Sequence, residues 1–278
     1  MKRATSIIIG FYVVLTGVIA CKKNTKSTDE QVLVVGYDST NLNWRKDTFR
    51  ITYSEETESN VYFELFQSPQ LPVQDTINAK VTYALNQGFQ GTGVSFPVYT
   101  ARDVEKACKA FNKEYLKFKE DEFSIAGWEY QWFASISKPF EEIICLHIKE
   151  WSFMGGAHGN GFEKYTLYSV PNGKQLKLED LFTDIRQLTR IAEKHFREQN
   201  IFDVDISLPL NEYGFEFENN QFALNDNFVL SSEGLFIQYN AYEIAPYAMG
   251  APSIIIPFDE IKPLLKISLT QTFENNSF

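Results

Sequence analysis

Three histidines and two of the three cysteines are the first residues to test for chemistry in this 278-residue chain. His147, His158 and His195 have no metal-site spacing, such as HExxH, to one another, to a cysteine or to a carboxylate. No G-x-S-x-G nucleophile motif is present. Cys108 and Cys145 lie in apolar patterns, where thiols are buried and unreactive. The sequence therefore predicts no metal or nucleophile motif, although its many carboxylates leave room for a site assembled in space.

His158 lies in the glycine-rich stretch FMGGAHGNGF, residues 153–162. A phosphate-binding loop leads into a helix N-terminus and, in its nucleotide form, carries Lys-Ser/Thr. Here the strand-like EKYTLYSV follows instead. We therefore expect a strand-to-strand turn, with glycines for positive φ or close packing. His158 then has two interpretations: hydrogen bonding to the backbone of its turn, which we favour, or an enzymatic site with nearby carboxylates that acts on cell-wall material.

A second unusual segment, NAYEIAPYAMGAPSIIIP, spans residues 240–257. Rigid aromatic loops that contain proline make good binding surfaces, since they lose little entropy on contact. The alternative is a buried connector whose tyrosines fill a core and hydrogen-bond through their hydroxyl groups. Both interpretations stay open. The candidate ligand-binding residues from this segment and the glycine loop are Tyr242, Glu243, Pro246, Tyr247, His158 and Asn160.

The N-terminus carries Lys2 and Arg3, then an apolar run over residues 7–20, then Cys21. This run is shorter than the ~20 residues of a spanning helix and has the length of a secretory signal. Its end resembles the lipobox of bacterial lipoproteins, which implies cleavage before Cys21 and acylation of its sulfur. We therefore expect an exported protein that is lipid-anchored without spanning, at the outer membrane and facing the periplasm or cell surface. The alternative is a plain signal peptide with an incidental cysteine.

Export also bears on the two other cysteines and on the charge. An exported compartment permits a disulfide, so Cys108 and Cys145 are either a bonded pair or two core thiols. Removal of residues 1–20 takes away Lys2 and Arg3 and no acidic residue, which changes the formal charge from −10 to −12. A chain this acidic, without a basic stripe, argues against nucleic-acid binding. It suits a cationic partner, or simply keeps the protein soluble.

Clustered rather than regularly alternating elements predict an α+β fold with mainly antiparallel sheets and two longer helices packed on them. Parallel β-α-β winding is not expected. One helix, TINAKVTYALNQ, begins at residue 76 and stops at Gly88. A second opens at the capping box of Thr100 and Asp103, and a third is capped by Thr183 or Asp184. Strand patterns fill residues 49–65, 128–151, 163–170 and 220–240. In EEIICLHIKEW the alternation puts Ile144, Leu146 and Ile148 on one face and Ile143, Cys145 and His147 on the other. We expect two adjoining small domains.

The two unusual segments, in this order, resemble the extracytoplasmic module of RsiV-like proteins, which also precedes the deacetylase domain of PdaC-like proteins. Its first domain carries an Ile-Asn helix and a GGAHxN loop, matched at residues 77–78 and 155–160. Its second has a G-x-x-L-x-L-x-D-L-F pattern, then YEIAPYAxG and I-P-x-x-E-I-K, matched at residues 173–182, 242–250 and 256–262. The departure is Gly159, where the family usually has proline, so a less rigid turn is expected.

The resemblance implies a division of the chain into a signal peptide at 1–20, a flexible tether at 21–45, a PdaC-like N-terminal domain at 46–168, an RsiV-like domain at 169–268 and a tail at 269–278. In RsiV-like proteins the module binds lysozyme, and in PdaC-like proteins the wall chemistry belongs to a separate deacetylase domain. We therefore expect a non-catalytic envelope recognition module without a cofactor. Its expected partner is a lysozyme-like cationic hydrolase or the wall glycan, peptidoglycan; a purely structural envelope role is the further alternative.

Overall fold

The structure is a computed structural model that describes residues 35–37, 45–68, 71–121, 126–201, 205, 208–266 and 268–269. All of these belong to one unit, Gln31–Phe278. Cys21, the expected signal peptide and the tail from residue 270 on lie outside the described residues. No helix in the described part is long and apolar enough to cross a membrane.

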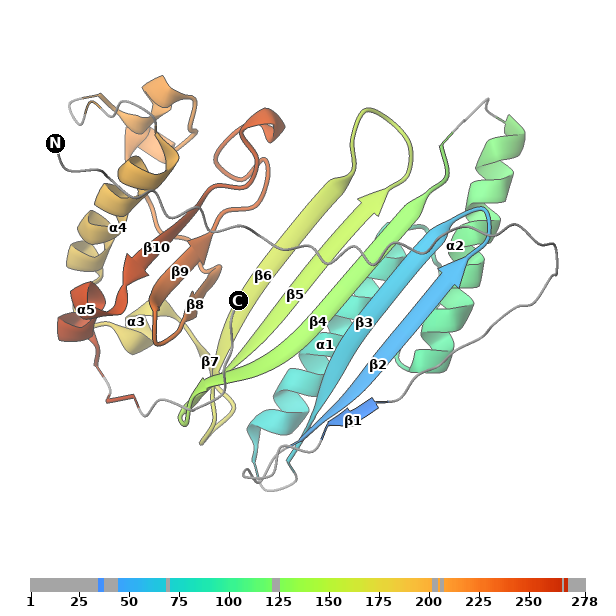
Figure 1. Ribbon diagram of the computed structural model, residues 1–278, viewed down its shortest axis with the longest axis horizontal. Coiled ribbons are helices and arrows are strands. Elements are labelled where there is room, and N and C mark those ends of the chain that lie inside the picture. Colours follow the sequence, from blue (N-terminus) through green and yellow to red (C-terminus); the bar gives the residue numbers. More distant parts are fainter. Residues whose placement is uncertain are drawn as a thin grey trace, which may run out of the picture. The chain divides into compact units, whose positions relative to one another are not determined.

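A seven-stranded sheet forms the larger part of the fold, with its strands side by side in chain order (Figure 1). Within the stretch predicted to be a tether, residues 35–37 pair with the next strand as β1. Neighbouring strands are antiparallel except for β3 and β4. The strands are β1 (Val35–Tyr37), β2 (Arg45–Ser54), β3 (Glu58–Gln67), β4 (Glu129–Phe140), β5 (Ile143–Phe153), β6 (Asn160–Ser169) and β7 (Gln175–Leu176).

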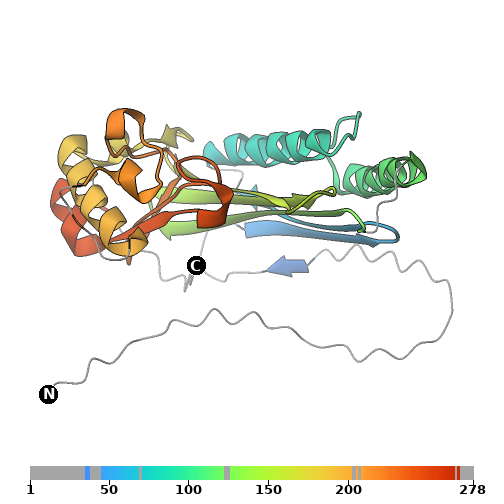
Figure 2. The ribbon, with the colours of Figure 1, turned by 90° about the horizontal axis from the view of Figure 1, so that it is seen from above.

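The parallel pairing of β3 with β4 corrects the expectation that such winding is absent. Two helices, α1 (Val73–Gly91) and α2 (Ala101–Asp121), separate these strands in the chain. They carry the chain from the end of β3 back to the end of the sheet where β3 begins, so β4 runs in the same direction as β3. Both helices lie on one side of the sheet (Figure 2). α1 contacts β3, β4 and β5, and α2 contacts β2. The opposite face of β2–β5, which α1 and α2 do not cover, is called the open face below.

Helix α1 does not end at Gly88 as predicted but continues to Gly91. Gly88 is buried inside the helix, where a Cβ would collide with the Tyr130 hydroxyl and lie 2.8 Å from the Glu150 carboxylate. Close approach to the sheet, rather than helix termination, therefore explains this glycine. The predicted capping box is confirmed, since Thr100 N and Asp103 N each bond the other's side chain.

Two hydrophobic clusters lie on opposite faces of β5. Ile144 and Leu146 belong to the cluster under α1 and α2, whereas Ile143 and Cys145 belong to the cluster that continues into the C-terminal part. This is the alternation predicted for EEIICLHIKEW. Cys108 and Cys145 are buried free thiols in different clusters, so no disulfide joins them. Burial raises the pKa of each thiol to about 12.

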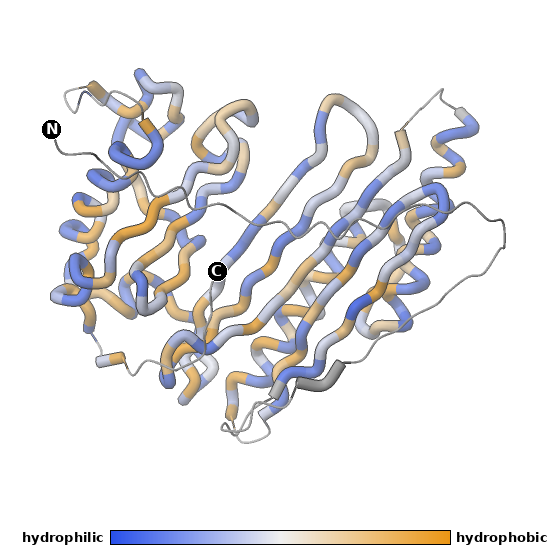
Figure 3. The backbone as a smooth tube through the Cα atoms, viewed as in Figure 1, coloured by the Kyte–Doolittle hydropathy of each residue, from blue (hydrophilic) through white to orange (hydrophobic). Residues whose placement is uncertain are grey.

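The C-terminal part places a three-stranded antiparallel sheet beside helix α4 (Ile185–Asn200), whose N-cap is Asp184. The side chain of Asp184 accepts a hydrogen bond from Gln187 N at 2.9 Å. The strands, in the order β10-β9-β8, are hydrophobic over much of their length (Figure 3). The three strands are β8 (Phe228–Leu230), β9 (Gly234–Gln238) and β10 (Ser253–Pro257). The C-terminal part also contains α3 (Leu178–Leu181), α5 (Phe258–Ile261) and short 3-10 turns that include η3 (Tyr247–Met249).

Candidate functional site

The glycine loop is the turn between β5 and β6, as predicted from the strand pattern that follows it. Gly155 and Gly156 have φ values of 91° and 98°, which favour glycine. Gly159 is required for a different reason, because a Cβ there would lie 2.5 Å from Cζ2 of the Trp151 indole. A large aromatic side chain therefore supports the turn at the position where the resembling family usually has proline.

The second loop joins β9 to β10 over residues 239–252. Tyr242 adopts a left-handed conformation with φ 67°, and Pro246 begins the 3-10 turn η3. Glu243 holds the loop together, since its carboxylate accepts hydrogen bonds from Asn240 N and from the Asn225 amide, both at 2.8 Å. The tyrosine side chains are thus presented by a backbone that is already fixed.

The two loops meet at His158, and both lie at the upper edge of Figure 1. The imidazole of His158 stacks on the Tyr247 ring, with centroids 3.7 Å apart and an interplanar angle of 11°. The Tyr242 hydroxyl lies 3.2 Å from Nε2, and the carbonyl oxygen of Gly159 lies 3.0 Å from Nδ1. With its proton on Nδ1, the ring donates to the Gly159 carbonyl and accepts from Tyr242.

This assembly, the loop pair, is defined by His158, Tyr242 and Tyr247, and it lies on the surface. Tyr242 is 60% exposed and Tyr247 37% exposed. Each loop also exposes a methionine, Met154 in one and Met249 in the other. Exposed tyrosines and methionines are residue types enriched at protein interfaces, where they supply apolar contact area. The loop pair therefore has the side-chain chemistry of a binding surface.

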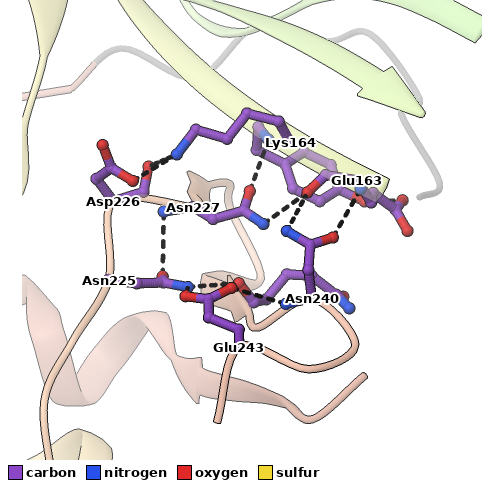
Figure 4. Close-up of polar contacts among 9 residues, drawn as sticks. Glu163, Lys164, Asn225, Asp226, Asn227, Asn240 and Glu243 are labelled. Atoms are coloured by element: carbon purple, nitrogen blue, oxygen red, sulfur yellow. Dashed lines mark hydrogen bonds and ion pairs between the residues drawn. The ribbon is translucent and has the colours of Figure 1, made fainter. Parts of the chain in front are cut away.

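Asparagine side chains from the second loop and from the residue before β8 hold the C-terminal part to the large sheet (Figure 4). Asn240 accepts a hydrogen bond from Glu163 N at 2.7 Å and donates to Glu163 O at 3.0 Å. Asn227, which is buried, accepts from Tyr165 N and donates to Glu163 O. These amides pair with the backbone of β6 where β7 does not reach it. The polar groups of this strand are satisfied by side chains in place of a neighbouring strand.

A second polar cluster lies beneath this contact, on β5 and β6. The Glu163 carboxylate lies 2.7 Å from His147 Nε2 and accepts a hydrogen bond from the Tyr165 hydroxyl at 2.9 Å. Burial by itself would raise the pKa of Glu163, but the hydrogen bonds and the nearby Lys149 outweigh it, so the pKa is lowered. The ionised carboxylate thus anchors the two neighbouring rings, which stack 4.3 Å apart.

Both ring nitrogens of His158 lie within hydrogen-bonding distance of groups in the two loops themselves. Among the described residues no carboxylate forms an ion pair or hydrogen bond with His158. Within the same residues, no group of three or more His, Cys, Asp or Glu has the arrangement of a metal site. His195 lies far along the chain in α4, where its Nε2 is 3.1 Å from Glu260.

Of the predicted binding residues, the structure brings His158, Tyr242 and Tyr247 together. Pro246 and Glu243 shape the loop instead, and Asn160 opens β6 opposite Ser152. Sequence reasoning missed Trp151 and the asparagines that clamp β6. Trp151 lies opposite Gly161 in the ladder. A large aromatic residue that faces a glycine-rich turn is a signal of close packing.

Residues 179–259 match the family model described as "Protein of unknown function (DUF3298)". The chain carries a DUF3298 domain. This DUF3298 domain contains α4, the three-stranded sheet and the loop of Tyr242 and Tyr247, whereas His158 precedes it. The loop pair therefore joins the DUF3298 domain to the preceding sheet.

One curated relative is the peptidoglycan-N-acetylmuramic acid deacetylase PdaC of Bacillus subtilis (strain 168), which is 22% identical over 202 residues. The match covers 68% of this chain and 42% of PdaC, so the chain spans less than half the length of that relative.

Two crystal structures of DUF3298 proteins resemble the fold. The one from Bacteroides fragilis NCTC 9343 has a TM-score of 0.56 at 18% identity and covers 85% of this chain and 96% of its own. The one from Pseudomonas aeruginosa PAO1 has a TM-score of 0.50 at 16% identity, with 81% and 96% covered. The α+β architecture around the DUF3298 domain is thus shared with these proteins.

Proposed function

We propose that this chain is a lipid-anchored envelope protein whose loop pair recognises a protein partner without catalysing a reaction. The observation that carries the proposal is the stacking of His158 on Tyr247, which assembles an exposed aromatic surface from two distant segments. Both hydrogen-bonding nitrogens of the imidazole are engaged in holding the loops. This use of His158 supports a positioning role in recognition.

The partner that fits best is a cationic, lysozyme-like hydrolase. The chain carries 36 acidic and 26 basic residues, so its long-range field attracts a cationic protein and speeds their encounter. Tyr242 and Tyr247 would supply the contact energy, because buried tyrosines are frequent hot spots at interfaces. The PdaC relative is named for action on peptidoglycan, which supports an envelope setting for the shared module.

Binding of the purified full chain to a lysozyme, measured by surface plasmon resonance at low and physiological salt, tests the partner. Tyr247→Ala should weaken binding by about thirtyfold, the effect of losing a hot spot of about 2 kcal/mol. Tyr83→Ala is the matched control, because Tyr83 is 63% exposed on α1 and outside the loop pair. Absence of binding at low salt, or equal losses in both variants, would refute the proposed partner.

The enzymatic alternative is tested on peptidoglycan fragments. The proposal expects no change in the fragments by mass spectrometry, with or without the His158→Ala substitution. Turnover by the wild-type chain that disappears in a correctly folded His158→Ala variant would overturn the non-catalytic role.

Lipid anchoring has its own test, because Cys21 lies outside the described residues. Cells grown with a labelled fatty acid should incorporate the label into the wild-type protein, and the Cys21→Ser variant should lose it. Retention of the label in Cys21→Ser would contradict acylation at this residue.

A further inference from the structure

A shallow groove of about 250 Å³ crosses the open face of β2–β5. Its size is below that of sites for drug-sized ligands and suits one ring-sized unit of a longer molecule. The groove, called the sheet groove, is separate from the loop pair. The side chains on the open face that line it are Arg50, Thr52, Asn60, Tyr62, Gln131, Phe133, Lys149 and Trp151.

The charge of the sheet groove is opposite to that of the chain as a whole. Arg50 and Lys149 are its two charged lining residues, and no Asp or Glu lines it. Arg50 forms no ion pair with the described residues, and Lys149, whose side chain is 60% exposed, has only a 3.8 Å contact to Glu163. On a chain with a formal charge of −10, this local positive field favours an anionic group.

Three neutral polar side chains in the groove have free hydrogen-bonding capacity. Thr52, Asn60 and Gln131 are exposed, and within the described part of the chain their side chains form no hydrogen bond. Amide and hydroxyl groups both donate and accept, which matches the hydroxyl and acetamido groups of a sugar.

The aromatic wall of the groove is rigid before any ligand arrives. Tyr62 and Phe133 stack with centroids 4.9 Å apart, and Arg50 lies over the Tyr62 ring at 5.6 Å. Trp151 is fixed against Gly159 and Gly161. Such preorganised rings lose little conformational entropy on binding.

A peptide would not use this groove by adding a strand. The groove lies on the face of β3–β5, which are paired on both sides within the sheet, and of β2, which pairs with β1 at residues 46–48. Side chains of this face line the groove, whereas strand addition uses the backbone groups of a sheet edge. The remaining chemistry, two cations with neutral hydrogen-bonding groups beside aromatic rings, matches a carboxylate-bearing sugar.

We propose that the sheet groove binds one carboxylate-bearing N-acetylhexosamine unit of a glycan. Arg50 and Lys149 bind the carboxylate, Asn60 and Gln131 bond the acetamido and hydroxyl groups, and the aromatic rings contact the C–H face of the sugar. The inference deepens the proposed envelope recognition with a second site, and it does not depend on the loop pair binding a protein.

The test is calorimetric titration of the full chain with an N-acetylglucosamine–N-acetylmuramic acid disaccharide and with the neutral N-acetylglucosamine dimer. The carboxylated disaccharide should bind, and the neutral dimer should bind about tenfold more weakly, since a hydrogen bond to a charged group contributes at least this factor. Arg50→Gln and Lys149→Gln should each weaken the carboxylated ligand by about tenfold. Lys80→Gln is the control, because Lys80 is exposed on α1, which covers the opposite face.

Unchanged thermal unfolding of Arg50→Gln shows that a loss of affinity is not a loss of fold. Tyr247→Ala should bind the disaccharide normally, which separates this site from the proposed protein-binding surface. The inference is overturned if neither sugar binds, if both bind equally, if Arg50→Gln and Lys149→Gln bind like the wild type, or if an acidic peptide without sugar binds as tightly as the disaccharide.

Discussion

The imidazole of His158 lies flat against the ring of Tyr247, with the two planes only 11° apart. His158 comes from the turn between β5 and β6, and Tyr247 from η3 in the DUF3298 domain. Neither turn by itself creates the stacked pair. The proposed binding surface therefore exists only while the DUF3298 domain is docked on β6, and the stability of that docking becomes a measurable condition for function.

The left-handed backbone of Tyr242 is predicted to lower the stability of the folded chain. A tyrosine at φ 67° carries strain of about 1–2 kcal/mol that glycine does not. Tyr242→Gly should therefore be more stable to urea than Tyr242→Ala by about 1 kcal/mol, although both lose the hydroxyl contact to His158. Equal stability of the two variants would show that the strain is absent in solution.

Gly159 is predicted to be intolerant of even one methyl group. Gly159→Ala places a Cβ against the Trp151 indole and should cost about 1–3 kcal/mol of unfolding free energy. Gly91→Ala is the matched control, since nothing lies within 4 Å of its Cβ position, and it should be neutral or gain up to about 1 kcal/mol. In a Trp151→Ala background the cost of Gly159→Ala should largely disappear. A full cost in that background would assign the effect to another contact.

Asn227 is predicted to hold the DUF3298 domain to the sheet. Asn227→Ala leaves the backbone groups Tyr165 N and Glu163 O without this partner, at a cost of about 2–4 kcal/mol. Hydrogen exchange at the Tyr165 amide should accelerate in the variant. Asn60→Ala, which removes an exposed amide on β3, should stay within about 0.5 kcal/mol of the wild type. A comparably small effect of Asn227→Ala would mean that these bonds contribute little to docking.

The ionised Glu163 carboxylate is predicted to stabilise the folded protein at neutral pH. Its pKa is lower in the folded chain than the ordinary value of 4.5, so its contribution is present above pH 4.5 and is lost as the pH falls through the folded pKa. Glu163→Gln should therefore be less stable than the wild type at neutral pH, with the difference shrinking in acid. Urea unfolding of both proteins across this pH range measures how the difference in their unfolding free energies changes with pH.

Glu150 is predicted to show the opposite pH dependence. Burial raises its pKa, so its contribution to stability is fully present below the ordinary value of 4.5 and is lost as the pH rises through the folded pKa. Glu150→Gln should gain stability relative to the wild type as the pH rises from acid to neutral. The same urea series checks this, and a slope of the same sign as that of Glu163→Gln would contradict it.

Much of the secondary structure was predictable because it rests on local rules. Period-two alternation predicted the two faces of β5, and capping residues predicted where α2 and α4 begin. Gly88 shows where local rules fail, since the residue that commonly ends a helix is here required inside one by the approach of Tyr130 and Glu150. The parallel pairing of β3 with β4 was likewise missed, because strand direction depends on how far α1 and α2 carry the chain.

By itself, the sequence determined the strand-to-strand nature of the glycine loop, since backbone freedom at glycine and the period of the following residues are local properties. It also singled out the loop that carries Tyr242 and Tyr247. Only the tertiary structure decided that the two loops share His158, that Glu243 and Asn240 are structural, and that Arg50, Gln131 and Lys149 line one groove. These relations depend on the register of neighbouring strands and on the docking of the DUF3298 domain, which place residues side by side that are far apart in the chain.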